Sequence, residues 1–323
     1  MFESDFVCYP NERFPSCHCS TVVELPDGEL LAAWYAGSAE ARPDVAILTA
    51  RKAPGATRWS EPTVAVDDDP ALPMGNCVLW VDRRAGVWLF YNVMHGRLEG
   101  PPGPGVRWDT CDCRCRISAD GGRTWGDYVM MRDEWGCVFR TKPLAHSGGE
   151  IIIGVEHSRE NSHFFVSADE RQSWIFTDRI PGVPNEHPTL IERSDGSILA
   201  LLRPSRDPRI ARSVSTDRGR TWTAAENTGL PNPGAAIDMV QLRKGRLVLA
   251  FNNSERRRTP LTLALSNDEG ETWPVMRDLE TEEGEFSYPA IIEDSRGLIH
   301  ATYTYRRTHI KHVCLSPSWL ESA

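Results

Sequence analysis

The feature that most constrains the fold is an eight-residue phrase that occurs four times along the 323-residue chain. Its copies read SADGGRTW, SADERQSW, STDRGRTW and SNDEGETW, and they end at Trp125, Trp174, Trp222 and Trp273. A degenerate copy, APGATRWSEP, contains Trp59. Successive full copies are thus 49, 48 and 51 residues apart. A repeat of roughly 40–50 residues indicates a structural unit that is used several times over.

A second periodic signal runs out of phase with the first. A turn glycine followed by an aliphatic run occurs six times, in PDGELLAAW, RAGVWLFY, GGEIIIGV, SDGSILALL, KGRLVLAF and RGLIHATY. Each run has the length and composition of a β-strand, and no stretch of helical period separates the runs. Several short strands per repeat are typical of a propeller blade. The sequence therefore predicts an all-β chain that forms one six-bladed β-propeller domain over residues 1–323, closed by pairing of residues 2–7 with 309–315.

The repeated phrase has the composition of a hairpin turn. Its aspartate can accept hydrogen bonds from backbone N–H groups, and its glycine can supply a positive φ. Its tryptophan is expected to pack between neighbouring sheets. Because the phrase recurs from blade to blade, we predict that it is scaffold and takes no part in chemistry.

Composition excludes some classes of function. A formal charge of -9 and a pI near 5.5 argue against binding to nucleic acid through its phosphates. No stretch is apolar and long enough to cross a membrane, and the first residues lack the pattern of a signal peptide, which favours the cytoplasm. Nine cysteines include the runs CHC and CDCRC. Alternation in a strand puts the CDCRC cysteines on one face, and the absence of CxxC pairs argues against zinc. We expect free thiols and no metal or other cofactor.

The phrase S-x-D-x-G-x-T-W resembles the Asp-box of the sialidase (neuraminidase) superfamily. The segments LPNPGAAID, FSYPAII and YTYRRTHIKHV make the chain most similar to the BNR-repeat, sialidase-like branch. The resemblance covers nearly the whole chain. It implies a six-bladed propeller whose active site lies at the mouth of the central channel. It also implies an arginine triad that binds the substrate carboxylate, a tyrosine nucleophile paired with a glutamate, and an aspartate that acts as acid and base.

Three residues match this pattern by their position relative to the turn glycines. Arg203 ends the strand after the SDG turn and matches the second arginine, and Arg258, with Arg257 as a neighbouring alternative, matches the third. Tyr288 matches the nucleophile. Two guanidinium groups can hold a carboxylate through planar, paired hydrogen bonds. The resemblance thus implies that Arg203 and Arg258 bind substrate and that Tyr288 is catalytic.

The first arginine and the acid are ambiguous. Arg13 in ERFPS matches the first arginine by its letters, whereas His18 occupies the equivalent position when residues are counted back from the PDG turn. Histidine can transfer a proton near neutral pH, which arginine cannot. Glu40 and Asp44, in the segment after the first PDG strand, are both candidates for the acid.

The activating glutamate is replaced as well. Counted relative to the SDG turn, the position of this glutamate is occupied by His187, and the adjacent Glu186 is expected to face the other way. Glu285 is a further candidate for activating Tyr288. Pro188 is expected to hold His187 in an extended conformation. Asp238, in the loop after LPNP, is a second candidate for substrate binding. A basic cluster near the C-terminus is explained equally well by a solvated strand edge or by sugar binding; it comprises Arg306, Arg307, Lys311 and His312.

Three functions remain open on these residues. The first is a glycoside hydrolase that acts on a terminal acidic sugar, so that the partner is an acidic oligosaccharide or glycoside and neither nucleic acid nor membrane. The second is a polysaccharide lyase on uronic-acid glycans with histidine and tyrosine as base and acid. The third is a propeller that binds glycans without catalysis.

Overall fold

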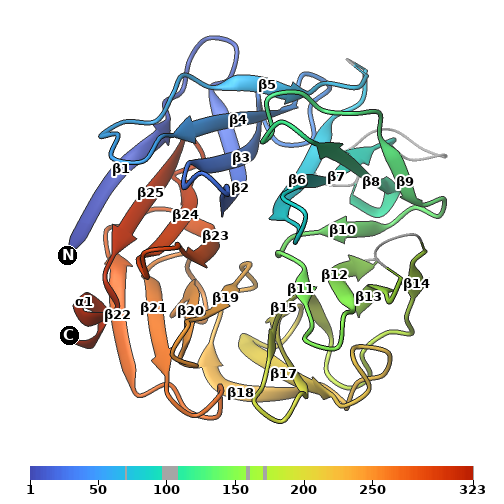
Figure 1. Ribbon diagram of the computed structural model, residues 1–323, viewed down its shortest axis with the longest axis vertical. Helices are drawn as coiled ribbons and strands as arrows, with labels where there is room; N and C mark the ends of the chain where they lie inside the picture. Colours follow the sequence, from blue (N-terminus) through green and yellow to red (C-terminus); the bar gives the residue numbers. More distant parts are fainter. Residues whose placement is uncertain (70, 97–107, 158–160, 170–172, 323) are drawn as a thin grey trace. The chain divides into compact units, whose positions relative to one another are not determined.

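The sheets form six blades, and the fold is an all-β, six-bladed β-propeller, as the sequence predicts (Figure 1). The structure is a computed structural model, and it describes residues 1–69, 71–96, 108–157, 161–169 and 173–322. Its helices are the 3-10 turn η1 (Trp108–Thr110) and α1 (Pro317–Glu321). No helix within the described residues has the length and apolar character that a membrane span requires.

By its internal contacts the chain divides into two compact units. The first contains Met1–Phe139 and Tyr288–Trp319, and the second contains Arg140–Ser287 and the residues from Leu320 onward. The prediction of a single domain over residues 1–323 stays a prediction, and the two units are described in turn.

In the first unit, two blades are consecutive four-stranded antiparallel sheets. One has the order β2-β3-β4-β5, with bounds Ser16–Glu24, Leu30–Gly37, Ala46–Lys52 and Thr63–Val66. The other has the order β6-β7-β8-β9, with bounds Met74–Val81, Val87–Met94, Cys111–Ser118 and Val129–Arg132. The short strand β10 (Cys137–Phe139) follows.

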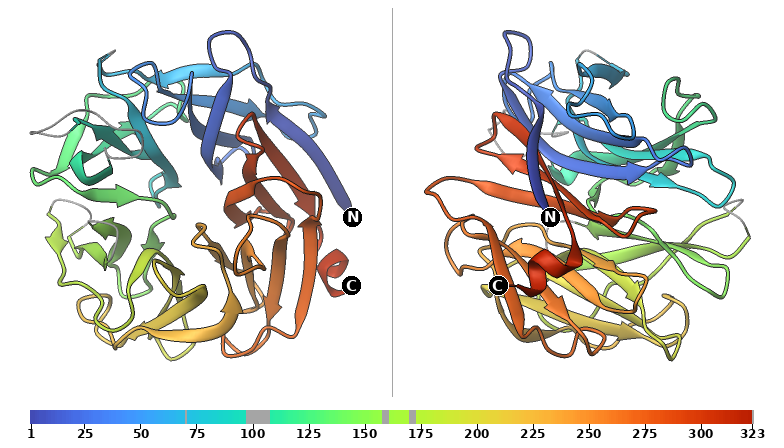
Figure 2. Two further views of the ribbon diagram at one scale, coloured as in Figure 1. Left: turned by 180° about the vertical axis from the view of Figure 1, so that it is seen from behind. Right: turned by 60° about the vertical axis from the view of Figure 1, so that its left-hand side comes forward.

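The last blade joins the two ends of the chain. Its order is β1-β25-β24-β23, with bounds Phe2–Cys8, His309–Leu315, Ile299–Tyr305 and Phe286–Glu293. Phe2 pairs with Leu315 and Phe6 with Lys311 in antiparallel register, and β1 runs beside β25 in each view (Figures 1 and 2). The predicted pairing of residues 2–7 with 309–315 is confirmed.

The second unit holds the remaining strands. β12 (Ile151–His157), β13 (Asn161–Ser167) and β14 (Ile175–Phe176) form one sheet, in which β11 (Leu144–Ala145) also pairs with β12. The next sheet has the order β15-β16-β17-β18, with bounds Asn185–Glu192, Ile198–Pro204, Arg209–Ser215 and Glu226–Pro231. The last has the order β19-β20-β21-β22, with bounds Asp238–Gln241, Leu247–Asn252, Leu261–Ser266 and Val275–Glu280.

The Asp-box copies form the hydrogen-bonded turns that the sequence predicts. In the fourth copy, Ser266 Oγ donates to Asp268 at 2.7 Å, the Thr272 backbone N–H donates to Asp268 at 2.9 Å, and Gly270 N–H donates to Ser266 Oγ at 2.9 Å. Bonds from Thr272 and Ser266 lower the pKa of Asp268 to about 2. The copies at 118–125 and 215–222 repeat this pattern. Residues 170–172 of the copy at 167–174 lie outside the described residues.

The Asp-box glycines also pack against the preceding blade. Gly270 has φ 89°, and a Cβ atom there would lie 2.5 Å from Leu199 Cδ2. Gly219 stands in the same relation to Ile152, at 2.9 Å. The Asp-box tryptophan adds to this contact, because the Trp222 ring stacks on Phe164 with centroids 4.4 Å apart. The Asp-box turn therefore packs tightly on the neighbouring sheet of its unit and so interlocks the two sheets.

Substituting an Asp-box glycine is expected to be costly. Gly270→Ala combines left-handed backbone strain with an overpacked contact and should lower the free energy of unfolding by about 2–5 kcal/mol. Gly196→Ala is the matched control, because Gly196 has φ 81° and open space around it. That variant should lose about 1–2 kcal/mol. Urea denaturation of both variants measures the difference, and equal losses would contradict the interlock.

All nine cysteines are buried and free, which confirms the predicted free thiols. Cys111, Cys113 and Cys115 lie in β8 and are at most 2% exposed.

Candidate active site

The first unit brings His18 of β2 and Tyr288 of β23 into contact. Their ring centroids are 4.2 Å apart with the planes inclined at 52°. Both strands are irregular at this point, since Cys19 has φ 60° and Tyr288 has φ 55°. A bulky residue with positive φ is strained, and such strain clusters at functional sites. The structure thus joins two of the predicted residues at an unusual stretch of backbone.

A second phenol, not predicted from the sequence, completes this cluster. The Tyr35 ring on β3 lies 5.6 Å from His18, in an edge-on arrangement. Tyr35 is 3% exposed, and its hydroxyl has no hydrogen-bond partner in the described residues. Burial raises the pKa of Tyr35 well above its usual value, and the charges of Glu40 and Cys19 act in the same direction. Tyr35 is therefore a neutral phenol that can donate a hydrogen bond.

The two candidates for the acid are both engaged. Glu40 forms an ion pair with Arg307 and accepts a hydrogen bond from Trp108 Nε1 at 3.1 Å. Asp44 accepts bonds from the backbone N–H and hydroxyl of Ser38, at 3.0 and 2.9 Å. Glu40 is thus part of a charged pair whose field reaches Tyr35, whereas Asp44 holds the loop that follows β3.

The C-terminal basic cluster divides among different environments. Arg307 pairs with Glu40, whereas Arg306 and Lys311 lie over the Tyr305 ring at 5.4 and 5.2 Å. His312 is 2% exposed and bonds to His300 at 2.9 Å. Of these residues, Arg307 is connected with Tyr35 through its ion pair with Glu40.

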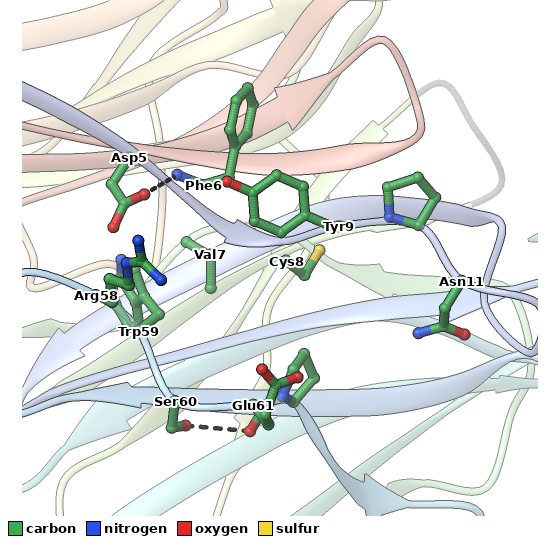
Figure 3. Close-up of a pocket in the computed structure, with 12 residues that line it drawn as sticks. Asp5, Phe6, Val7, Cys8, Tyr9, Asn11, Arg58, Trp59, Ser60 and Glu61 are labelled. Carbon is green, nitrogen blue, oxygen red and sulfur yellow. Dashed lines mark hydrogen bonds between the residues drawn. The ribbon is translucent and has the colours of Figure 1, made fainter.

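Arg13 has partners other than His18 and Tyr288. Its side chain is 67% exposed, forms an ion pair with Asp67 at 3.9 Å and lies over the Phe14 ring. His18, the position favoured by the interval, is the residue that contacts Tyr288. A surface pocket of about 650 Å³ on this unit has different walls, formed by β1 and residues 58–62, and none of the predicted site residues lines it (Figure 3).

The second unit gathers a charged cluster around Arg203, at the end of β16. Its Nη1 lies 3.1 Å from His187 Nδ1 and 3.3 Å from Glu186 Oε2, both on β15. His187 Nε2 lies 2.9 Å from Glu156 Oε2 on β12. Glu156, Glu186 and His187 are each more than nine-tenths buried. Glu156 is a residue of this cluster that the sequence analysis missed.

Two expectations about β15 are wrong. Glu186 does not face away from His187, because both side chains reach Arg203. His187 is not extended, because its φ is 44°. The pairing of β15 with β16 shifts register between Glu186 and Thr189, and such a bulge breaks the alternation of side chains.

These contacts fix the protonation of His187. A guanidinium group only donates hydrogen bonds, so Nδ1 must accept from Arg203. The proton of the neutral imidazole is then on Nε2, facing Glu156. Burial, aided by the charges of Arg203 and Arg140, lowers the pKa of His187 although Glu156 opposes the shift. His187 thus orients Arg203 and is unsuited to transferring a proton to substrate.

The same geometry argues against a metal in this cluster. Glu156, Glu186 and His187 place three possible ligand atoms within 4.8 Å of one another. Arg203 lies against two of these three residues, and both nitrogens of His187 already face other groups. A positive guanidinium beside the ligands disfavours a cation, so these residues fit an arginine clamp better than a metal site.

Stability should depend on the buried histidines. Burial is the largest of the effects that lower the pKa of His187, His300 and His312. Their usual pKa is about 6.5, so an unfolded chain binds protons below this pH while the folded chain resists them. The contribution of these histidines to the free energy of unfolding should be constant above about pH 7.5. It should fall as pH drops below 6.5, by at most about 1.4 kcal/mol per pH unit for each histidine. Urea denaturation between pH 8 and 5 measures this, and a flat profile would contradict it.

The other two predicted substrate-binding residues have partners of their own. Arg258 pairs with Glu285 at 2.7 Å, and Ser287 Oγ also donates to Glu285. Arg203 and Arg258 therefore have different acidic partners. Asp238 is 2% exposed and pairs with Lys142 at 2.7 Å, while Thr189 donates to its other oxygen. Lys142 thus neutralises Asp238 inside the unit.

Similarity to known proteins agrees with this fold. An all-β propeller with interlocking Asp-box turns defines the class, and the family model of the BNR repeat-like domain matches residues 28–301. The chain belongs to this family, and it is a protein of the sialidase superfamily. A sialidase from Micromonospora viridifaciens is 26% identical over an alignment of 262 residues, and the match covers 72% of this chain and 40% of that protein. The chain therefore spans less than half the length of this curated relative.

Solved structures share the fold at lower identity. A protein of unknown function from Dyadobacter fermentans has a TM-score of 0.82 at 17% identity, covering 98% of this chain and 99% of that one. The intramolecular trans-sialidase from Ruminococcus gnavus, solved with oseltamivir carboxylate, has a TM-score of 0.77 at 16% identity, with 97% of each chain covered. These likenesses show the fold alone.

Proposed function

We propose that the chain is a glycoside hydrolase that releases a terminal acidic sugar from an oligosaccharide or glycoside. The contact between His18 and Tyr288, at a strained point of β23, carries this proposal. Membership of the family and the likeness to a sialidase support it.

The residues of the first unit suit the chemistry. A phenol is a weak nucleophile until a base removes its proton, and His18 is a base in contact with the Tyr288 ring. In the first step a bond forms between the Tyr288 oxygen and the anomeric carbon, and the bond to the departing oxygen breaks. That oxygen takes up a proton, and water then cleaves the sugar from Tyr288. The buried Tyr35 hydroxyl can donate a hydrogen bond during these steps.

The two arginines account for the proposed preference for an acidic sugar as substrate. Arg203 and Arg258 are the groups proposed to bind the carboxylate, through charge-assisted hydrogen bonds. Arg203 is held in a fixed orientation by His187 and Glu186, so little side-chain freedom is lost when it binds substrate.

A second candidate rests on the contacts of His18 with two phenols, Tyr288 and Tyr35. A lyase needs a base to remove the proton beside a uronate carboxylate and an acid to protonate the departing oxygen. The carbon–oxygen bond breaks as a carbon–carbon double bond forms. An imidazole and a phenol fit these two roles.

The product distinguishes the candidates. Purified protein is incubated with aryl glycosides of sialic and uronic acids and with uronic-acid oligosaccharides, and products are analysed by mass spectrometry and ultraviolet absorbance. A hydrolase releases a saturated sugar with added water. A lyase releases an unsaturated, ultraviolet-absorbing uronate without added water. Saturable binding without turnover, unaffected by Tyr288→Phe, would support a non-catalytic glycan-binding protein and overturn both enzymatic candidates.

A further inference from the structure

The proposed hydrolysis needs a group that gives a proton to the departing oxygen. Neither acid expected from the sequence is well placed to do so. Glu40 is already paired with Arg307, and Asp44 already accepts two bonds from Ser38. The first unit contains another group of the required kind, His95, which immediately follows β7.

His95 forms a hydrogen-bonded pair with a buried carboxylate. Its Nε2 lies 2.7 Å from Asp112 Oδ2 on β8. The Asp112 side chain is 3% exposed, whereas that of His95 is 23% exposed. The imidazole stacks on Trp135, with centroids 4.9 Å apart and planes inclined at 6°. The buried Asp112 carboxylate therefore holds Nε2 of His95, and stacking on Trp135 fixes the plane of the ring.

Arg114 occupies both oxygens of Asp112. It donates to Oδ1 from Nε at 3.0 Å and to Oδ2 from Nη2 at 2.7 Å, so both oxygens act as acceptors. His95 Nε2 is then the donor in its contact with Asp112 Oδ2. Because Nε2 is held by Asp112, Nδ1 is the nitrogen proposed to exchange a proton with substrate. A buried carboxylate that orients a partly exposed histidine is also the arrangement of hydrolytic triads.

Packing connects His95 to the environment of Glu40. Met94, the last residue of β7, precedes His95 and packs with Trp108, and Trp108 Nε1 donates to Glu40. Trp108 also packs against the core cluster that Tyr288 contacts. These contacts link the end of β7, which precedes His95, to the segment that carries Glu40.

We propose that His95, oriented by Asp112, is the proton-transfer residue of this chain. In the imidazolium form, Nδ1 gives its proton to the departing oxygen as the glycosidic bond breaks. The resulting neutral imidazole then takes a proton from the water that releases the sugar from Tyr288. An imidazole can give a proton in one step and take one up in the next. The proposal rests on the hydrolase function, and Asp112 acts in it as a positioning residue.

Leaving groups test this directly. Two glycosides of the same acidic sugar are compared, one releasing an alkyl alcohol and one releasing an acidic nitrophenol that departs without a proton. His95→Ala should lower kcat on the alkyl glycoside by about 10²- to 10⁴-fold, and much less on the nitrophenyl glycoside. Asp112→Asn should show the same preference to a smaller extent. Equal losses on both substrates, or no loss on either, would overturn the proposal.

Two controls separate chemistry from structure. His95→Gln can keep a hydrogen bond to Asp112 but cannot transfer a proton, so it should show the same dependence on leaving group as His95→Ala. His309→Ala removes a partly exposed histidine of the same unit that packs on Phe6 and Tyr9, and should act like wild type on both substrates. Turnover of the nitrophenyl glycoside by wild type tests the hydrolase function independently of His95. If wild type turns over neither glycoside, the hydrolase function fails and this proposal fails with it.

Discussion

Tyr288→Phe should lower kcat by on the order of 10³-fold or more while the protein stays folded. The substitution removes one hydroxyl and keeps the ring that contacts His18. Loss of a hydroxyl is expected to change the free energy of unfolding by about 1 kcal/mol. Because the proposed bond to the anomeric carbon forms at this oxygen, the loss should fall on kcat rather than on substrate binding.

Steady-state kinetics and urea denaturation of Tyr288→Phe test both parts of this prediction. Tyr9→Phe is the matched control, since Tyr9 is 62% exposed and packs on Phe6 and His309. It should act like wild type. A Tyr288→Phe enzyme with a normal kcat would show that the chemistry takes place elsewhere.

The fold was predictable because its signals are local and repeated. Each Asp-box copy contains its own turn, with the serine, aspartate and glycine that bond to one another a few residues apart. The pairing of β1 with β25 was also predictable, since a propeller needs a strand to complete its last blade. Both inferences follow from the repeat itself and need no knowledge of individual side-chain contacts.

The site was predictable only in part, for the opposite reason. The predictions of His18, Tyr288 and Arg203 rest on their positions relative to turn glycines. Glu156 was missed, although it stands seven residues after Gly149, as Arg203 does after Gly196 and Tyr35 after Gly28. A comparison of this one register position among the blades would have found both Glu156 and Tyr35.

Some features of the candidate site leave no recognisable signal in the sequence. The wrong expectation for Glu186 arose because a bulge cannot be seen in the alternation of residue types, and His187 adopts φ 44° at that bulge. The pairs Glu40–Arg307 and His95–Asp112 join residues that are far apart in the chain or on different strands. Their partners are set by packing, which one sequence does not display.

Arg203→Ala should weaken the binding of an acidic substrate by about 2–5 kcal/mol, seen mainly as a higher KM. It should also reduce stability, because Glu186 would lose the guanidinium beside it. Arg203→Lys keeps the charge but not the planar pair of donors, so it should recover part of the stability and less of the affinity. Arg209→Ala is the matched control, since Arg209 forms a more exposed ion pair with Glu255 in the same unit.

A substrate without the carboxylate isolates the interaction. Wild type and Arg203→Ala are each assayed with the acidic sugar and with an analogue whose carboxylate is replaced by a neutral amide. If Arg203 binds the carboxylate, Arg203→Ala should weaken the binding of the acidic sugar strongly and leave the binding of the amide analogue nearly unchanged. The coupling between the two changes should then be about 2 kcal/mol or more. A coupling near zero, with both substrates weakened equally, would mean that Arg203 only supports Glu186 and His187, and the carboxylate would have to be bound by another residue.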